Sequence, residues 1–477
     1  MSSDLEMSAE QFRAAAVHAA AIVERYYAEL ASSPVMPATS ARDIRELLYE
    51  PLPEAGAGPE AALATIRDVV YPLSRHNAHP RFFGYVASPG TGAAAIGDFL
   101  AAGLNANVTA WRSAPAAAEM EHLVIDWLKT MIGYEASAAG LLVSGGSMAN
   151  FCGLAAARTA ADPEFARTGA GGAPLRVYVS EETHFSIQKA AGLLGIGTSN
   201  VQAIPTDASL RVDVAELERR IETDRKAGFR PMCVVANAGT VNTGAVDPIA
   251  DVAGVAERNR MWLHVDGAYG AFAALAPSAR GLFTGIERAD SVSLDPHKWL
   301  YSSMGCGCVL YRDPSSATAA FAHQAEYTRP VGLSRDEAFA FWDFGPELSR
   351  PFRALPLWLA IKLHGVRAFS AAIENNLACA RHFEALVKPS DDFEMLAPVS
   401  LSIFCFRFRP PGYSGDLDAL NERILVELQR AGSSYVSNAR IRGKFALRGC
   451  VLNHRTTLRD MERLLDDVRN AASITLG

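Results

Sequence analysis

Lys298 is the residue in this sequence that is best suited to covalent chemistry. It is one of only seven lysines, against 38 arginines, and it lies in the run Asp295-Pro296-His297-Lys298-Trp299, directly after the apolar segment 291–294. A lysine amine in a partly desolvated pocket can form a Schiff base with a carbonyl compound. A purely structural lysine would need a specific buried partner here, so the sequence favours a nucleophilic role.

Asp266 ends another apolar segment and is flanked by small residues. The run Trp262-Leu263-His264-Val265-Asp266-Gly267-Ala268 would let a flat ring lie against Ala268, with the carboxylate at the edge of that ring. From this segment alone, a helix cap is an equally good explanation of Asp266.

Three further polar runs follow apolar segments in the same way. The run 144–147, Ser-Gly-Gly-Ser, opens a helix and is typical of a phosphate or carboxylate cradle, although a capped turn explains it equally well. It matches neither the Walker lysine pattern nor the GxGxxG spacing. His184 could stack on a planar ligand or move protons, while a hydrogen-bonded loop histidine is the simpler explanation. Thr240 places a hydroxyl in the same layer.

Taken together, these five features describe a pyridoxal phosphate site. In this interpretation Lys298 binds the aldehyde carbon of the cofactor and Asp266 keeps its pyridine nitrogen protonated. Gly146 and Ser147 hold the phosphate, and His184 and Thr240 lie around the ring.

The elements that must position these residues are short apolar strands that alternate with helices. Strands are predicted at 141–143, 176–180, 201–205, 232–237, 261–266, 291–294 and 306–311, and helices at 119–133, 147–158, 212–226 and 248–259. This alternation predicts an α/β fold with a mostly parallel sheet that is covered on both faces. In such sheets the ligand lies beyond the carboxyl ends of the strands, where the polar runs are.

The chain divides into three predicted parts. Residues 1–92 mix helix with turns at Pro34, Pro37, Pro51, Pro53 and Pro59. Because this segment cannot easily form its own core, we expect it to pack on something else, such as a second subunit. Residues 93–355 form the large domain. Residues 356–477 form a small α+β domain with long helices and an alternating strand at 401–408.

Composition excludes several classes of protein. The net charge is 45 − 52 = −7, which offers no basic face to nucleic acid or to an anionic membrane. No run approaches the roughly 18 apolar residues that a membrane span needs, and the acidic N-terminus predicts an amphipathic helix rather than a signal peptide. Seven scattered cysteines favour buried thiols over disulfides or a metal site. We therefore expect a cytoplasmic protein without a bound metal.

The chain resembles the group II pyridoxal phosphate-dependent amino-acid decarboxylases, the family of aromatic-L-amino-acid, tryptophan, tyrosine, glutamate and histidine decarboxylases. The matching pieces run through almost the whole chain: HPRFFGYV at 79–86, SAPAAAEMEHLVIDWL at 113–128, SGGSMAN at 144–150, THFS at 183–186, NAGT at 237–240, WLHVDGAYG at 262–270, DPHKW at 295–299 and SRPFRALPLW at 349–358. The HVDGAY and HKW pieces, about thirty residues apart, are highly specific together.

The resemblance implies fold type I: an N-terminal segment that clasps a partner subunit, a seven-stranded large domain and a small C-terminal domain. It implies homodimers with the active site between subunits. It also implies that His184 stacks on the cofactor ring, that Ala268 lies against the ring, and that Thr240 lies near the ring substituents and the substrate carboxylate. The further cofactor-binding residues implied are Gly146, Ser147, Asp266, Asp295, His297 and Lys298.

The same resemblance implies a reaction and a substrate pocket. Tyr327, in a loop beyond Lys298, matches the tyrosine that protonates the product carbon after CO2 has left, whereas related aldehyde synthases tend to have phenylalanine there. A packing tyrosine is the alternative. The implied pocket consists of Tyr85, Val86, Ser88, Asn107, Thr109 and Trp111, the last three from the other subunit. Val86, Asn107 and Thr109 depart from the bulkier apolar residues of the animal aromatic decarboxylases.

The resulting interpretation is decarboxylation of an aromatic L-amino acid to the amine and CO2. One alternative is an aldehyde synthase or a decarboxylase of another amino acid of the same family. A second is a non-catalytic relative that serves as a binding module, which the joint presence of Lys298, Asp266, His184 and Tyr327 opposes. A third, a Rossmann nucleotide-binding protein, is opposed by the missing glycine spacing and ribose-binding acid.

Overall fold

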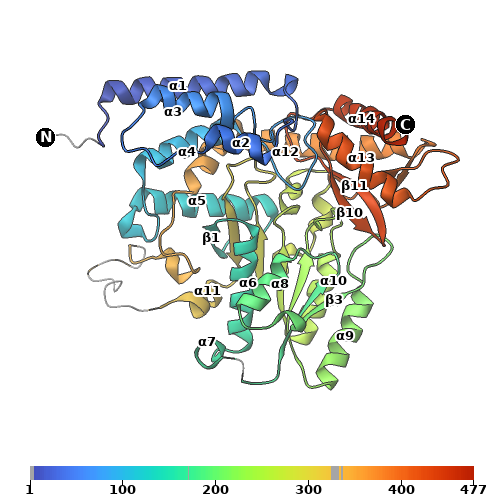
Figure 1. Cartoon of the computed structure of the whole chain (residues 1–477). Coiled ribbons are helices and arrows are strands. Elements are labelled where there is room, and N and C mark those ends of the chain that lie inside the picture. The colour runs from blue at the N-terminus through green and yellow to red at the C-terminus, as the bar shows by residue number, and fades with distance from the viewer. Residues whose placement is uncertain (1–4, 170, 324–331, 333, 335–336) are drawn as a thin grey trace.

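A seven-stranded sheet lies at the centre of the molecule (Figure 1). The computed structural model describes residues 5–169, 171–323, 332, 334 and 337–477. The strand order is β1-β7-β6-β5-β4-β2-β3. The strands are β1 (Ala139–Val143), β2 (Leu175–Ser180), β3 (Val201–Ile204), β4 (Arg230–Asn237), β5 (Trp262–Asp266), β6 (Ser291–Leu294) and β7 (Gly307–Tyr311).

The sheet is mostly parallel, which confirms the predicted fold class. The pairs β2–β3, β2–β4, β4–β5 and β5–β6 are parallel, and only β7 runs antiparallel to its neighbours β1 and β6. Six carboxyl ends therefore meet at one edge of the sheet, and the polar runs that follow the strands converge there.

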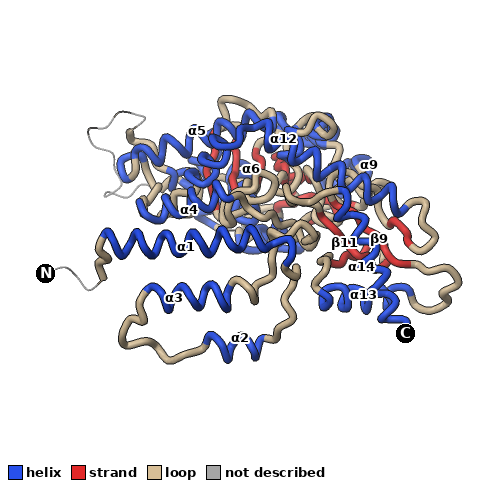
Figure 2. Tube along the Cα trace, turned by 90° about the horizontal axis from the view of Figure 1, so that it is seen from above, coloured by secondary structure: helices blue, strands red, loops and turns tan. Residues whose placement is uncertain are grey.

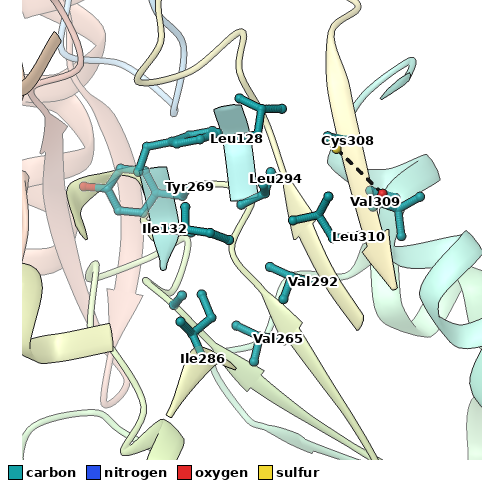
Figure 3. Packing of buried hydrophobic residues seen from close by; sticks show 14 of the residues in the cluster. Leu128, Ile132, Val265, Tyr269, Ile286, Val292, Leu294, Cys308, Val309 and Leu310 are labelled. Carbon is teal, nitrogen blue, oxygen red and sulfur yellow. Dashed lines mark hydrogen bonds between the residues drawn. The ribbon is translucent and has the colours of Figure 1, made fainter. Parts of the chain in front are cut away.

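Helices cover both faces of this sheet. They are α5 (Pro115–Ile132), α6 (Gly146–Ala161), α7 (Phe165–Thr168), α8 (Ser186–Leu193), α9 (Val214–Lys226), α10 (Ile249–Asn259) and α11 (Pro314–Phe321). The predicted stop of α5 at Gly133 is confirmed, because this glycine takes the left-handed conformation (φ 70°) that ends many helices. Figure 3 shows Leu128 and Ile132 of α5 gathered with Val292 and Leu294 of β6 in the main hydrophobic core.

The N-terminal helices lie along one side of the body (Figure 2). They are α1 (Ala9–Glu29), α2 (Ala41–Leu48), α3 (Pro59–Thr65) and α4 (Gly92–Leu104). Ile22 is the one buried residue of α1, while Phe12 and Val17 are 53% and 65% exposed, and α2 and α3 bury none of their residues. The segment has no core of its own, as its prolines indicated.

The C-terminal part combines three helices with a four-stranded antiparallel sheet in the order β10-β11-β9-β8. The elements are α12 (Ala354–Val387), β8 (Phe393–Met395), β9 (Ile403–Phe408), α13 (Leu417–Ala431), β10 (Ser437–Ile441), β11 (Lys444–Cys450) and α14 (Leu458–Leu476). The predicted domain boundaries after residues 92 and 355 fall in the first turns of α4 and α12, and they stay predictions.

The strand predicted at 401–408 begins at residue 403 and is not half-exposed. All six residues of β9 are buried, because both faces of the strand are covered. Phe404 and Phe406 pack in a core shared with α13 and α14, whereas Ile403 and Cys405 pack in the main core beside the large domain. Alternate residues of β9 therefore belong to two buried apolar faces, rather than to one buried face and one solvent-exposed face.

The structure also bears on the predicted absence of membrane spans and on the predicted burial of the cysteines. Among the described residues, the structure contains no helix that combines the length and the apolar character required to span a membrane. All seven cysteines are buried free thiols. Burial raises the pKa of Cys152 to about 12, and the same cause raises that of Cys405 to about 12, so neither thiol is activated.

Two glycines of α4 give opposite predictions for stability. A Cβ at Gly97 would lie 2.4 Å from Cα of Pro356 in α12, whereas a Cβ at Gly103 would meet nothing within 4 Å. We expect Gly97→Ala to lower the free energy of unfolding by about 1–3 kcal/mol through overpacking. Gly103→Ala, its matched control, should raise it by about 0.5–1 kcal/mol. Urea unfolding at fixed protein and cofactor concentrations measures both, and equal shifts would contradict the tight α4–α12 contact.

Candidate active site

A cavity of about 670 Å³ opens at the carboxyl edge of the central sheet. This volume is typical of pockets for small ligands. The loops after β1, β2, β4, β5 and β6 line this cavity, together with residues of the N-terminal segment and of the small sheet. The lining residues include Tyr85, Val86, Gly146, Ser147, Asn150, His184, Phe185, Asp266, Ala268, Asp295, His297, Lys298 and Arg448.

Lys298 lines this cavity, with its amine 2.9 Å from Oδ2 of Asp295. Asp295 is only 3% exposed, and its Oδ1 is buried without a hydrogen-bond partner among the described residues. Lys298 therefore does have a buried partner, Asp295. The pair nevertheless lines a cavity, and Oδ1 of Asp295 remains without a hydrogen bond among the described residues. Nδ1 of His297 donates to the carbonyl of Cys306 (2.8 Å), which fixes this part of the loop.

Asp266 ends β5 and is held by three donors. Nδ2 of Asn150 donates to Oδ2 (2.9 Å), while Oγ of Ser293 and the amide of Ala268 donate to Oδ1 (both 3.2 Å). The helix-cap alternative does not apply, because the next helical turn, 271–275, has Gly270 at its N-cap position and no side-chain cap. The carboxylate is thus rigidly oriented at the cavity wall.

The loop after β1 also fits a ligand rather than a capped turn. Helix α6 begins at Gly146, and no side chain caps it, so the first N–H groups of the helix face the cavity. A Cβ at Gly146 would lie 2.8 Å from both Cβ of Ala268 and Oδ2 of Asp295. Only glycine allows this close approach of the loop to Ala268 and Asp295, which follow strands β5 and β6.

His184 follows β2 and also lines the cavity. Its Nδ1 is 2.8 Å from Oγ of Ser186, and its ring packs against Phe185 with centroids 4.2 Å apart. Burial lowers the pKa of His184 below its usual 6.5, so the ring is neutral at neutral pH. A neutral, flat imidazole can stack on a planar ligand.

Comparisons with known proteins agree with this geometry. The family model for the pyridoxal-dependent decarboxylase conserved domain matches residues 42–409. The chain belongs to the pyridoxal-dependent decarboxylase family. An aromatic-L-amino-acid decarboxylase of Bacillus atrophaeus is 36% identical over 99% of this chain and 98% of its own length. A phenylacetaldehyde synthase of Petunia hybrida is 31% identical over 95% and 92%. The crystal structure of Oryza sativa TDC with PLP and tryptamine superposes with a TM-score of 0.93 at 30% identity, covering all of both chains.

The protein is thus a pyridoxal phosphate-dependent amino-acid decarboxylase, and the residues of the cavity fit that cofactor. The uncapped start of α6 offers donors to a phosphate. The carboxylate of Asp266 and the amine of Lys298 line the same cavity.

Several predicted residues of this decarboxylase do not line the cavity. Thr240 is 1% exposed, and its hydroxyl is bonded to Thr243 (3.0 Å) and accepts from the amide of Ala245 (3.2 Å). Ser88 lies behind the cavity wall, where it donates to the carbonyl of His297 (2.7 Å). Tyr327 lies outside the described residues.

The predicted set Asn107, Thr109 and Trp111 also lies away from this cavity, against the segment 339–350. Oδ1 of Asn107 accepts from the amide of Arg350 (2.9 Å), and the amide of Trp111 donates to the carbonyl of Phe339 (3.1 Å). This segment follows the loop that carries Tyr327 along the chain. Of the predicted pocket, the first two members, Tyr85 and Val86, line the cavity of the same chain.

Sequence reasoning missed Arg448, which lines the decarboxylase cavity at 3% exposure. It donates to the carbonyls of Tyr85 (3.0 Å), Val241 and Asn242 (3.1 Å), and so joins the N-terminal segment, the large domain and β11. Tyr85 has the uncommon left-handed conformation (φ 57°) that presents its carbonyl to this arginine. The signal in the sequence was an arginine within the apolar strand 444–450.

Proposed function

We propose that this protein decarboxylates an aromatic L-amino acid to the amine and CO2 in the cytoplasm, as a homodimer with its active site at the subunit interface. The observation that carries the proposal is that Lys298 and Asp266 line one cavity, beside an uncapped helix start that can hold a phosphate. Bound pyridoxal phosphate supplies the electron sink that accepts the electron pair of the breaking Cα–carboxylate bond.

The residues of the chain have distinct tasks in this reaction. Lys298 would hold the cofactor through its amine, which can bind a carbonyl carbon covalently and reversibly. Asp266 would keep a proton on the pyridine nitrogen, which would preserve the electron-accepting form of the ring. The N–H groups of Gly146 and Ser147 would bind the phosphate, and His184 and Ala268 would contact the ring.

Two features support an aromatic side chain on the substrate. Phe185 and Tyr85 line the cavity while remaining 58% and 51% exposed, so both rings are available for contact. In the described part of the chain, the cationic lysine and arginine residues that line the cavity are Lys298 and Arg448. The first is paired with Asp295 and the second is bonded to three carbonyls, which leaves little to bind an acidic side chain.

The dimer is supported by apolar side chains on the outer helices. Phe12 of α1 stacks on Phe99 of α4 (6.3 Å between centroids), yet each is 53% exposed. Ile96 and Leu100 extend the same face of α4 at 55% and 49% exposure. A second copy that covers this face would bring its own segment 107–111 toward the interface. Light scattering across a dilution series measures the mass, and a monomer at assay concentrations would contradict the dimer.

The experiment that tests the function is an assay of the purified protein, saturated with pyridoxal phosphate, against tryptophan, tyrosine, phenylalanine, histidine, glutamate and aspartate. CO2, amine, aldehyde and hydrogen peroxide are measured in each reaction. We expect CO2 and amine in equal amounts from an aromatic amino acid. Equal amounts of CO2, aldehyde and peroxide would identify an aldehyde synthase instead, and turnover of glutamate alone would overturn the aromatic assignment.

Tyr327 is proposed as the acid that decides between amine and aldehyde. A positioned acid speeds proton transfer by roughly 10²–10⁴-fold, so removal of its hydroxyl exposes a slower reaction with oxygen. We expect Tyr327→Phe to consume substrate and release CO2, but to lower the amine-to-aldehyde ratio by about 10-fold or more, because solvent still supplies some protons. The ratio is measured in air and under nitrogen. An unchanged ratio would assign the proton to another donor.

A further inference from the structure

A continuous series of buried hydrogen bonds reaches both His184 and Asp266 from the interior of the sheet. Its centre is Asn150 of α6, whose Nδ2 is 2.9 Å from Oδ2 of Asp266 and 2.9 Å from Oγ of Ser186. Behind Asn150 lies His264 of β5, which is fully buried, with Nε2 2.9 Å from Oδ1 of Asn150. Nδ1 of His264 is 2.8 Å from Oγ of Ser291.

The chemistry of the partners fixes the direction of each bond around His264. A carboxylate only accepts, so Asn150 must turn its NH2 group to Asp266 and its carbonyl oxygen to His264. Nε2 of His264 therefore carries a hydrogen and donates. Burial lowers the pKa of His264 to about 4, so the ring has one proton and its Nδ1 accepts from the hydroxyl of Ser291. Ser291 in turn accepts from Trp262, whose indole N–H can only donate (2.8 Å).

The second branch leads from Asn150 to His184. The other hydrogen of the Asn150 amide is donated to Ser186, so the Ser186 hydroxyl directs its own hydrogen to Nδ1 of His184 at 2.8 Å. The backbone amide of Ser186 donates to the same nitrogen (3.3 Å). Nδ1 of His184 is thus an acceptor, and because the ring is neutral its single proton lies on Nε2.

We propose that Asn150 and His264 are positioning residues that fix the proton of His184 on Nε2 and hold the Asp266 carboxylate in line for the pyridine nitrogen. Each acts through another residue, since His264 does not line the cavity and the Asn150 amide is occupied on both sides. The fold reserves space for this arrangement: a Cβ at Gly153 would lie 2.6 Å from Nδ1 of His264. The inference rests on the proposed place of the cofactor ring between His184 and Ala268, but not on the identity of the substrate.

The test uses the full-length holoenzyme labelled with ¹⁵N-histidine. Nitrogen shifts and their coupled ring protons report which imidazole nitrogen carries hydrogen, and His184→Gln identifies the His184 signals by their loss. In the unmodified enzyme we expect His184 as a single form with its proton on Nε2. In Asn150→Ala, Ser186 no longer receives a hydrogen and can accept from Nδ1, so we expect both forms of His184.

Cofactor affinity gives a second readout, from titration of the apoprotein with pyridoxal phosphate. Loss of a hydrogen bond to a charged group should raise the dissociation constant roughly 10- to 100-fold in Asn150→Ala. We expect His264→Leu to raise it about 10-fold, and His264→Gln, whose amide can still donate to Asn150, to stay within about threefold of the unmodified protein. Tyr178→Phe is the matched control, because it removes a buried hydrogen bond from Tyr178 of β2 to Asp224 of α9 (3.1 Å) in the same sheet without touching this series.

The outcomes separate a positioning role from a structural one. The proposal is overturned if His184 carries its proton on Nδ1 in the unmodified enzyme, or if Asn150→Ala leaves both the proton position and the affinity unchanged. It is also overturned if Tyr178→Phe produces the same changes. Neither readout requires substrate, so a failure of the proposed decarboxylation would not alter these results. If His264→Leu does not fold, Asn150→Ala and His264→Gln decide the question.

Discussion

Replacement of Lys298 with alanine should give a protein that no longer holds pyridoxal phosphate covalently and that turns over substrate at least about 10³-fold more slowly. The amine of Lys298 lies at the cavity surface, 2.9 Å from the buried Asp295. Without it, the cofactor depends on the phosphate cradle and Asp266 alone. The variant also loses the positioned amine that receives the cofactor back after each turnover.

Borohydride treatment provides the measurement. In the unmodified holoenzyme it should abolish the yellow colour and fix the cofactor on one peptide, which mass spectrometry would assign to Lys298. Lys189→Ala is a suitable control, because Lys189 lies 5.2 Å from the ring of Phe185 beside the cavity without lining it. That variant should keep both label and activity. A reducible link to another lysine in Lys298→Ala would overturn the assignment.

The central sheet could be predicted from sequence because each of its strands is a short apolar run that ends at a polar residue. Buried parallel strands need no alternation, so runs such as 291–294 stand out from the helices around them. The carboxyl ends of parallel strands must share one edge, and for that reason Lys298, Asp266 and His184 could be expected to lie together. The topology of the sheet determines that part of the site.

The hydrogen-bond partners within the site could not be predicted in the same way. Asn150 and His264 are 114 residues apart in the sequence. From sequence, each of them could equally be a hydrogen-bonded core residue or a ligand contact, so the bond between them could not be predicted. Arg448 likewise finds its carbonyl acceptors only because the small sheet folds back on the loop after β4. Thr240 follows β4 as predicted. In the turn at 240–245, however, its hydroxyl is hydrogen-bonded to Thr243 and does not line the cavity.

Replacement of Asp266 is expected to slow turnover by about 10²–10⁴-fold while cofactor remains bound. Deletion of one member of a buried charge pair typically costs about 3–5 kcal/mol, and each 1.36 kcal/mol in the barrier is a factor of ten in rate. Asp266→Ala would in addition leave the three donors of Asn150, Ser293 and Ala268 without their acceptor. Its effect therefore mixes lost charge with local rearrangement.

Asp266→Asn separates these two contributions, because it keeps the size of the side chain and can still accept from Asn150. The polarity of the Asn150 amide forces the new amide to turn its oxygen toward Nδ2 of Asn150, 2.9 Å away in the present structure. Its NH2 group then takes the place of Oδ1, to which the amide of Ala268 and Oγ of Ser293 donate (both 3.2 Å). Asp266→Asn therefore removes the negative charge that a protonated pyridine nitrogen needs, and it sets an NH2 group against the backbone N–H of Ala268. We expect kcat to fall almost as far in Asp266→Asn as in Asp266→Ala, with the cofactor still attached to Lys298. The loss of unfolding free energy should be smaller in Asp266→Asn, because the Asn150 donor keeps its acceptor. Near-normal kcat in Asp266→Asn at full cofactor occupancy would show that the charge of this carboxylate does not support the reaction.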